Sequence, residues 1–217
     1  MDLIIGGGKY GCHAIEYLRE QNRDFLVVDT NTNCSAVRRF KLKPSKGLNL
    51  RSEAFITGGL TKVLELIEEL KPGYVFPTAP VHIAADLVKI KFDLVPWSEE
   101  IPNILPKLPE AVVLQTENDK LVVSFNKGYN CIDKCSMPEI CPSSGIKKPC
   151  TMINLMRFAS PAAFILISHS MAPGMGALKG AELLESFNWA KRKDEFVIGT
   201  ACNCHGVFSA FRKQAKI

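Results

Sequence analysis

Residues 3–29, LIIGGGKYGCHAIEYLREQNRDFLVVD, hold two short apolar runs separated by a glycine turn and a helical segment. The first run, Leu3-Ile4-Ile5, stops at Gly6-Gly7-Gly8, which indicates a buried strand entering a tight turn. Residues 9–21 carry apolar side chains at helical spacing, and residues 25–28 are a second β-rich run. The stretch therefore predicts two parallel strands joined by a helix.

The same alternation continues to about residue 95. Further strands are predicted at 54–57 and 74–76, and further helices at 33–40, 60–70 and 81–89. Alternating strands and helices are typical of an α/β domain in which helices cover both faces of a parallel sheet. We expect such a domain over residues 1–109, ending in a proline-rich connection, followed by a smaller α/β domain over residues 110–217.

The glycine turn predicts a binding site for a dinucleotide. Gly6, Gly8 and Gly11 match the pattern G-x-G-x-x-G, in which glycines allow a tight turn and the close approach of a pyrophosphate. Asp29 ends the second strand, where a carboxylate can bind a ribose and would repel a 2′-phosphate. These residues favour NAD over NADP, and the alternative is a glycine turn that binds no nucleotide.

On these residues, together with Ile56-Thr57-Gly58-Gly59 and the strand 74–78, the chain resembles the NAD(P)-binding Rossmann superfamily. The similarity covers about residues 1–95 and is greatest to the nucleotide-binding domains of potassium-transport regulators and to short NAD-dependent dehydrogenase modules. It implies that Gly6, Gly8 and Gly11 line the pyrophosphate. It also implies that Asp29 binds the ribose and that the Thr78 loop passes near the adenine or nicotinamide.

The second half begins with a predicted hairpin of strands at 111–116 and 120–125. A strand at 164–167, a loop at 168–176 and a helix at 177–193 follow. His169 lies in this loop, beyond the carboxyl end of a strand, where α/β sheets present ligands. It is the candidate catalytic, proton-handling residue, and a histidine that only hydrogen-bonds within a loop is the alternative.

Four cysteines, Cys131, Cys135, Cys141 and Cys150, lie in a segment without apolar periodicity. Such a segment cannot bury a core of its own, so a ligand must order it. Irregular spacings and the Cys141-Pro142 step favour an iron–sulfur cluster bound by these four thiolates. Zinc, disulfides and unligated thiols are the alternatives.

A second cysteine group, Cys202-Asn203-Cys204-His205, ends the β-rich run 195–200. Strand alternation predicts that both cysteines face one side. Four interpretations of the two cysteines are open: they complete the metal site, they relay electrons, they form a redox-active thiol pair, or they are small buried residues of a strand. Cys12 and Cys34 are isolated and are interpreted as ordinary semi-buried positions.

Composition narrows the protein class. Hydrophobic residues make up 47% and charged residues 23% of the 217 residues, which is typical of a globular protein, and no apolar run is long enough to cross a membrane. The absence of a signal peptide predicts a cytoplasmic protein, where thiols stay reduced. The excess positive charge lies after residue 125, but few aromatic residues accompany it, so nucleic acid is an unfavoured partner.

Together these features predict a redox protein, an NAD-dependent oxidoreductase that binds NAD(H) and a four-cysteine iron–sulfur cluster and passes electrons to a partner protein. The alternatives are a non-catalytic sensor of nucleotide or metal state with structural zinc, and a structural subunit with an empty nucleotide site. The sequence leaves open whether the chain forms a homo-oligomer.

Overall fold

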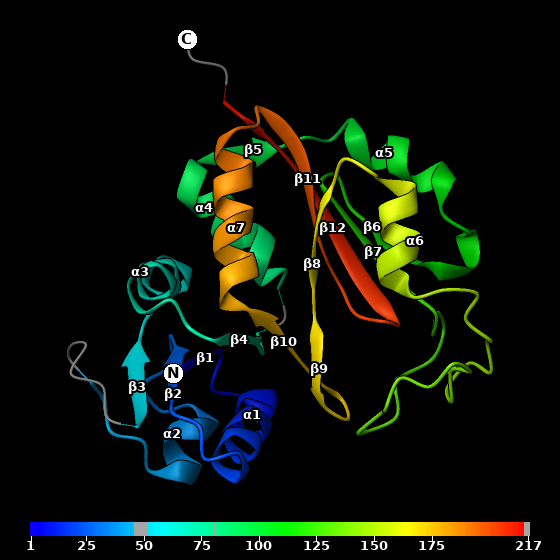
Figure 1. Cartoon of the computed structure of the whole chain (residues 1–217). Coiled ribbons are helices and arrows are strands. Elements are labelled where there is room, and N and C mark those ends of the chain that lie inside the picture. The colour runs from blue at the N-terminus through cyan, green and yellow to red at the C-terminus, as the bar shows by residue number, and fades with distance from the viewer. Residues whose placement is uncertain (46–51, 80, 215–217) are drawn as a thin grey trace.

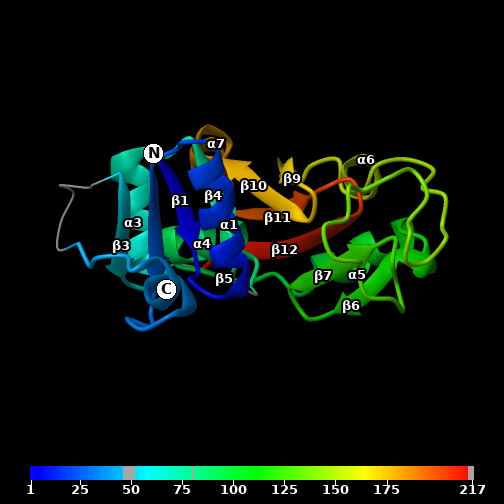
Figure 2. The same ribbon diagram turned by 90° about the horizontal axis from the view of Figure 1, so that it is seen from below.

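A computed structural model describes residues 1–45, 52–79 and 81–214. In these residues it shows a mixed α/β architecture with two mixed β-sheets and seven α-helices (Figure 1). Figure 2 shows the first sheet and its helices at one end of the molecule and residues 126–150 at the other. The prediction of an α/β protein is therefore confirmed.

The first sheet has the strand order β3-β2-β1-β4-β10-β9. Its four predicted strands are parallel neighbours, but β10 adds to β4 in antiparallel orientation, and β9 adds to β10. The predicted purely parallel sheet is thus wrong in this respect, because a hairpin from the second half of the chain completes it. The strands are β1 (Asp2–Ile5), β2 (Phe25–Asp29), β3 (Glu53–Thr57), β4 (Tyr74–Pro77), β9 (His169–Ala172) and β10 (Met175–Lys179).

The second sheet has the order β6-β7-β12-β11-β8, with the short β5 paired to β12. Only β8 and β11 are parallel; the other pairs are antiparallel. The long strand β12 has no counterpart among the predicted elements. The strands are β5 (Leu94–Pro96), β6 (Val113–Thr116), β7 (Lys120–Ser124), β8 (Phe164–Ile167), β11 (Glu195–Ala201) and β12 (His205–Lys213).

The seven α-helices of the described residues cover the faces of both sheets. Strand alternation divides the first sheet: Ile4 faces a cluster with α1 and α2, whereas Leu3 and Ile5 face α3, α4 and α7. The helices are α1 (Lys9–Glu20), α2 (Ser35–Phe40), α3 (Leu60–Leu70), α4 (Ile83–Phe92), α5 (Glu100–Ile104), α6 (Met152–Ala159) and α7 (Gly180–Lys191).

One hydrophobic cluster joins the two sheets. It combines Leu3 and Leu26 of the first sheet with Ile198 and Phe211 of the second, through side chains of α4 and α7 such as Phe187. A second cluster packs α6 against the far face of β11 and β12. The division predicted between residues 109 and 110 stays a prediction, and buried apolar contacts cross it.

Three local predictions differ from the structure. The connection predicted at 96–109 holds α5 and a 3₁₀ turn at Leu105–Lys107. The loop predicted at 168–176 is mostly strand, and the helix predicted to begin at residue 177 begins at Gly180. No helix of the described residues is both long and apolar enough to span a membrane.

Candidate functional site

The cysteine-rich segment folds back onto the turn between β11 and β12. Its first backbone N–H, at Phe125, donates to the carbonyl of Cys204 at 3.1 Å. At its other end, the N–H of Met152 donates to the carbonyl of Asn203 at 3.0 Å. The segment therefore leaves the second sheet and returns to it at one place, although it contains no helix or strand of its own.

This return brings the two predicted cysteine groups together. The Cys131 Sγ atom lies 3.2 Å from Nε2 of His205, and Nδ2 of Asn126 donates to the same sulfur at 3.1 Å. The other imidazole nitrogen, Nδ1, lies 2.6 Å from Oγ of Ser124, which donates to Oδ1 of Asn126. Four side chains thus form a closed ring of hydrogen bonds.

The ring fixes the roles of its donors and acceptors. Because the Ser124 hydroxyl hydrogen goes to Asn126, its oxygen must accept from Nδ1 of His205. We therefore assign the Nδ1–H tautomer to a neutral His205, which leaves the Nε2 lone pair facing Cys131. Burial, and then the nearby Lys148 ammonium, lower the pKa of His205, in agreement with a neutral ring.

A lysine contacts the second group of sulfurs. Lys148 Nζ donates to Sγ of Cys204 at 3.2 Å and to the carbonyl of Met137 at 3.2 Å. The backbone N–H of Cys204 lies 3.4 Å from Sγ of Cys202. A cation and N–H groups are therefore directed at sulfur, and each favours the thiolate form, although burial outweighs the effect of Lys148 at Cys204.

The thiols influence one another. Burial raises the pKa of Cys131, and the neighbouring Cys135, Cys141, Cys204 and Cys202 raise it further. Burial also raises the pKa of Cys204, although Lys148 opposes this. At Cys141 burial alone would raise the pKa, but hydrogen bonds from Ser144 and Ser143 outweigh it and the pKa is lowered.

We define the thiol site as Cys131, Cys135, Cys141, Cys150, Cys202, Cys204 and His205. All six cysteines are free. Within residues 1–45, 52–79 and 81–214, no three His, Cys, Asp or Glu side chains already stand in an arrangement that could hold a metal ion. The predicted four-cysteine ligand set stays a prediction, and it omits Cys204 and His205, which the fold places beside it.

The first sheet also reaches the thiol site. At the tip of the β9–β10 hairpin, the N–H of Gly174 donates to the carbonyl of Cys135 at 2.9 Å. Gly174 has a φ of +78°, and an added Cβ would lie 3.2 Å from the backbone of Lys134. A side chain there would separate the hairpin from the cysteine segment.

The residues predicted to bind a nucleotide make hydrogen bonds and close contacts within the glycine turn. Gly6 has a φ of +105°, and the hydroxyl of Thr78 donates to its carbonyl at 2.7 Å. An added Cβ on Gly11 would lie 2.1 Å from the Gly6 oxygen, whereas one on Gly8 would meet nothing within 4 Å. The Asp29 carboxylate accepts from the N–H groups of Gly7 at 2.6 Å and Asn31 at 2.7 Å. These contacts are internal to the fold, so nucleotide binding at this turn stays a prediction.

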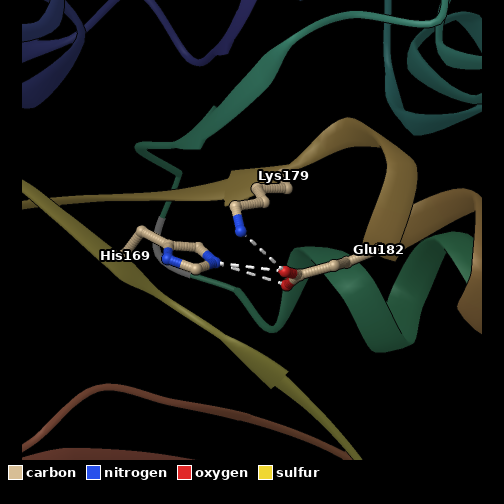
Figure 3. Close-up of polar contacts among 3 residues, drawn as sticks. All are labelled: His169, Lys179 and Glu182. Carbon is tan, nitrogen blue, oxygen red and sulfur yellow. Dashed lines mark hydrogen bonds and ion pairs between the residues drawn. The ribbon is translucent and has the colours of Figure 1, made fainter.

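His169 lies in β9 rather than in a loop. Its Nε2 atom is 3.3 and 3.4 Å from the two carboxylate oxygens of Glu182, and Lys179 Nζ is 3.3 Å from Oε1 of Glu182 (Figure 3). The ring of Tyr74 meets His169 edge-on. His169 therefore belongs to a polar group at the start of α7, and its role as a proton-handling residue stays a prediction.

Several residues of the site could not be assigned by sequence patterns. Ser124 and Asn126 look like the end of an ordinary strand, and only their spacing of two residues indicates side chains on one side. The contact of Lys148 with Cys204 joins residues 56 positions apart, so it too depends on the fold and not on a local pattern. Cys12 and Cys34 are buried in the core of the first sheet, away from the thiol site.

Two family models together cover most of the chain. AF_1314_N, described as "Uncharacterized protein, N-terminal domain", matches residues 1–83, and AF_1314_C, described as "Uncharacterized protein, C-terminal domain", matches residues 84–214. A relative from Archaeoglobus fulgidus, described as "Uncharacterized protein", is 42% identical over 98% of this chain and 100% of its own length. No solved structure matches the chain.

These matches correct the resemblance drawn from the glycine turn. Residues 1–83 match AF_1314_N and not the NAD(P)-binding Rossmann superfamily. The G-x-G-x-x-G pattern misled because a glycine turn between a strand and a helix also occurs where the glycines serve close packing alone. The matches over 1–83 and 84–214, with the full-length relative, show that the chain belongs to the AF_1314 family.

Proposed function

We propose that the thiol site binds an iron–sulfur centre and that the protein carries electrons. The observation that carries this proposal is the meeting of Cys131 and His205 across two segments distant in sequence, with four further thiols, those of Cys135, Cys141, Cys202 and Cys204, near enough to raise the pKa of Cys131. These five thiols alone supply more sulfur ligands than a single centre needs.

The long irregular segment supports the same proposal. Between β7 and α6 the chain has no regular element, and its bridge between Ile140 and Lys147 is an isolated pair. Loops of this length without regular structure inside a compact domain are uncommon and are usually functional. A bound centre would supply the stabilisation that the segment's few buried apolar side chains cannot supply.

The groups directed at sulfur favour an electron carrier over a purely structural metal. Hydrogen bonds and positive charge near cluster sulfurs raise the reduction potential of iron–sulfur centres. Lys148 and Asn126 provide a cation and an amide donor at 3.2 and 3.1 Å from sulfur. When bound, the cluster would accept and release single electrons, and these two side chains would hold its sulfur ligands in place.

A redox titration tests the proposal. The wild-type protein, purified without oxygen, is expected to show a visible absorption that bleaches with dithionite and a paramagnetic signal in one oxidation state. Cys135→Ser should remove both, whereas Cys12→Ser, a control outside the thiol site, should retain both. A colourless wild-type protein that contains zinc would contradict electron transfer and favour a structural or sensory metal site.

One observation favours a second candidate function. Cys131 is exposed, and its sulfur faces a histidine whose other nitrogen is oriented by Ser124. A thiol, a base and an orienting group in this order are the arrangement of a nucleophilic cysteine that attacks an electrophilic carbon or sulfur atom. In metal-free protein, His205→Gln should then slow alkylation of Cys131 by iodoacetamide. An unchanged rate would contradict this candidate.

A further inference from the structure

A pocket of about 390 Å³ opens between α1 and α2, on the outer face of the first sheet. It is lined by Lys9, Cys12, His13, Ser35, Arg38 and Arg39. Lys9 and His13 are four residues apart and therefore lie on one side of α1. The pocket uses none of the residues of the thiol site.

Positive charge in the pocket exceeds the negative charge beside it. Arg39 forms an ion pair with Glu16 of α1. Lys9 and Arg38 have no ion-pair partner within the described residues, and Lys9 instead lies over the ring of Tyr10, 5.7 Å from its centre. Of the three cationic side chains that line the pocket, one is paired with a carboxylate among the described residues, which leaves two positive charges to be balanced by solvent or by a ligand.

The remaining lining suits an oxyanion. Ser35 contributes a hydroxyl group, and the imidazole of His13 can donate as well. Guanidinium groups present several N–H donors in a plane and bind phosphate with two parallel hydrogen bonds.

From this pocket we infer a binding site for a phosphate or diphosphate group, with Arg38, Arg39 and Lys9 as its principal ligands. The Glu16 carboxylate holds Arg39 across the interface between α1 and α2 and so positions it before the ligand binds. A doubly charged anion matches the two unbalanced cations, which a neutral or singly charged ligand does not. The phosphate belongs either to a free phosphate compound or to a nucleotide.

Calorimetry at constant ionic strength tests this site with inorganic phosphate, pyrophosphate and ATP. Wild-type protein should show saturable binding of pyrophosphate, and Arg38→Gln should weaken it about tenfold, as expected for the loss of a charged hydrogen-bonding group. The matched control is Arg192→Gln, an exposed arginine after α7 and outside the pocket, which should bind as wild type does.

The three ligands separate the two sources of phosphate. Tighter binding of ATP than of pyrophosphate would support the site and identify a nucleotide, whereas equal binding would support the site and identify the phosphate groups alone. The inference is overturned if wild-type protein binds none of the three ligands. It is also overturned if Arg38→Gln and Arg192→Gln bind pyrophosphate equally well.

Discussion

The Sγ atom of Cys131 and the Nε2 atom of His205 lie 3.2 Å apart, although 74 residues separate them in the sequence. The contact exists because the segment after β7 leaves the second sheet beside the β11–β12 turn and returns to the same turn before α6. It makes one thiol site out of two cysteine groups that lie far apart in the sequence. The first two predictions follow from this site.

Cys204→Ser should lower the iron content of the anaerobically purified protein. Cys204 lies beside Cys202 and is the sulfur that Lys148 contacts, so it belongs to the same site as the four cysteines of the long segment. The measurement is iron per chain by elemental analysis, with Cys12→Ser as the control. Full iron in Cys204→Ser would exclude Cys204 as a ligand and leave the four-cysteine set.

Lys148→Met should lower the reduction potential of the bound centre. The change removes a positive charge and a hydrogen-bond donor 3.2 Å from sulfur, and both favour the reduced, more negative state. Lys147→Met is the matched control, because it removes the same charge from an exposed side chain that pairs with Glu139. Equal potentials in the two variants, measured by redox titration, would show that the contact has no electronic effect.

Gly11→Ala should destabilise the protein by about 1–3 kcal/mol, the usual cost of overpacking. Its Cβ would lie 2.1 Å from the Gly6 carbonyl oxygen, a backbone atom that cannot move aside freely. Gly8→Ala, whose Cβ would meet nothing within 4 Å, should stay within about 0.5 kcal/mol of wild type. Urea unfolding measures both, and equal losses of stability would contradict the packing role of Gly11.

His82 should make the protein less stable as the pH falls below neutrality. Both imidazole nitrogens are satisfied, by Ser209 at 2.9 Å and Thr200 at 3.0 Å. Burial, and then Lys120, lower the pKa of this histidine from 6.5 to about 3. Between pH 6.5 and about pH 3, His82 is therefore protonated in the unfolded chain and neutral in the folded chain.

The contribution of neutral His82 is complete above pH 6.5 and falls by about 1 kcal/mol per pH unit as the pH decreases toward 3. His82→Gln removes this titration, so the difference in unfolding free energy between wild type and variant should shrink from pH 7 to pH 5. A difference that does not change with pH would contradict the assignment.

The first half of the fold could be predicted because its signals are local. The helix predicted at 60–70 is found at Leu60–Leu70, since its apolar side chains share one face and Pro72-Gly73 stops it. The strands β1 to β4 are continuous apolar runs bounded by turn residues, as buried parallel strands are.

The β9–β10 hairpin could not be predicted, because the pairing that joins it to the first sheet, β10 with β4, is not local. Pro173, Gly174 and Gly176 are turn residues and indicate a loop when taken alone. In the structure Ala177 pairs with His169 within the hairpin, and Leu178 pairs with Val75, about a hundred residues earlier in the chain, which adds the hairpin to the first sheet.

The thiol site was predicted in part. The cysteine-rich segment and the Cys202–His205 group could both be found from composition, but their contact depends on how the second sheet closes. Alternation predicted a strand through Cys202 and Cys204, whereas the chain turns there, with the Cys202 N–H donating to the His205 carbonyl at 2.9 Å. His205 follows this turn as the first residue of β12, where it pairs with Ser124 of β7 and its side chain meets Cys131.

The iron and acid-labile sulfide content of the protein purified without oxygen tests whether the thiol site holds an iron–sulfur centre. An iron–sulfur centre at the thiol site predicts iron and sulfide in similar amounts, both lost together in Cys135→Ser and both retained in Cys12→Ser. Protein that contains neither iron nor sulfide, with the six cysteines of the thiol site all free to react with a thiol reagent, would contradict it.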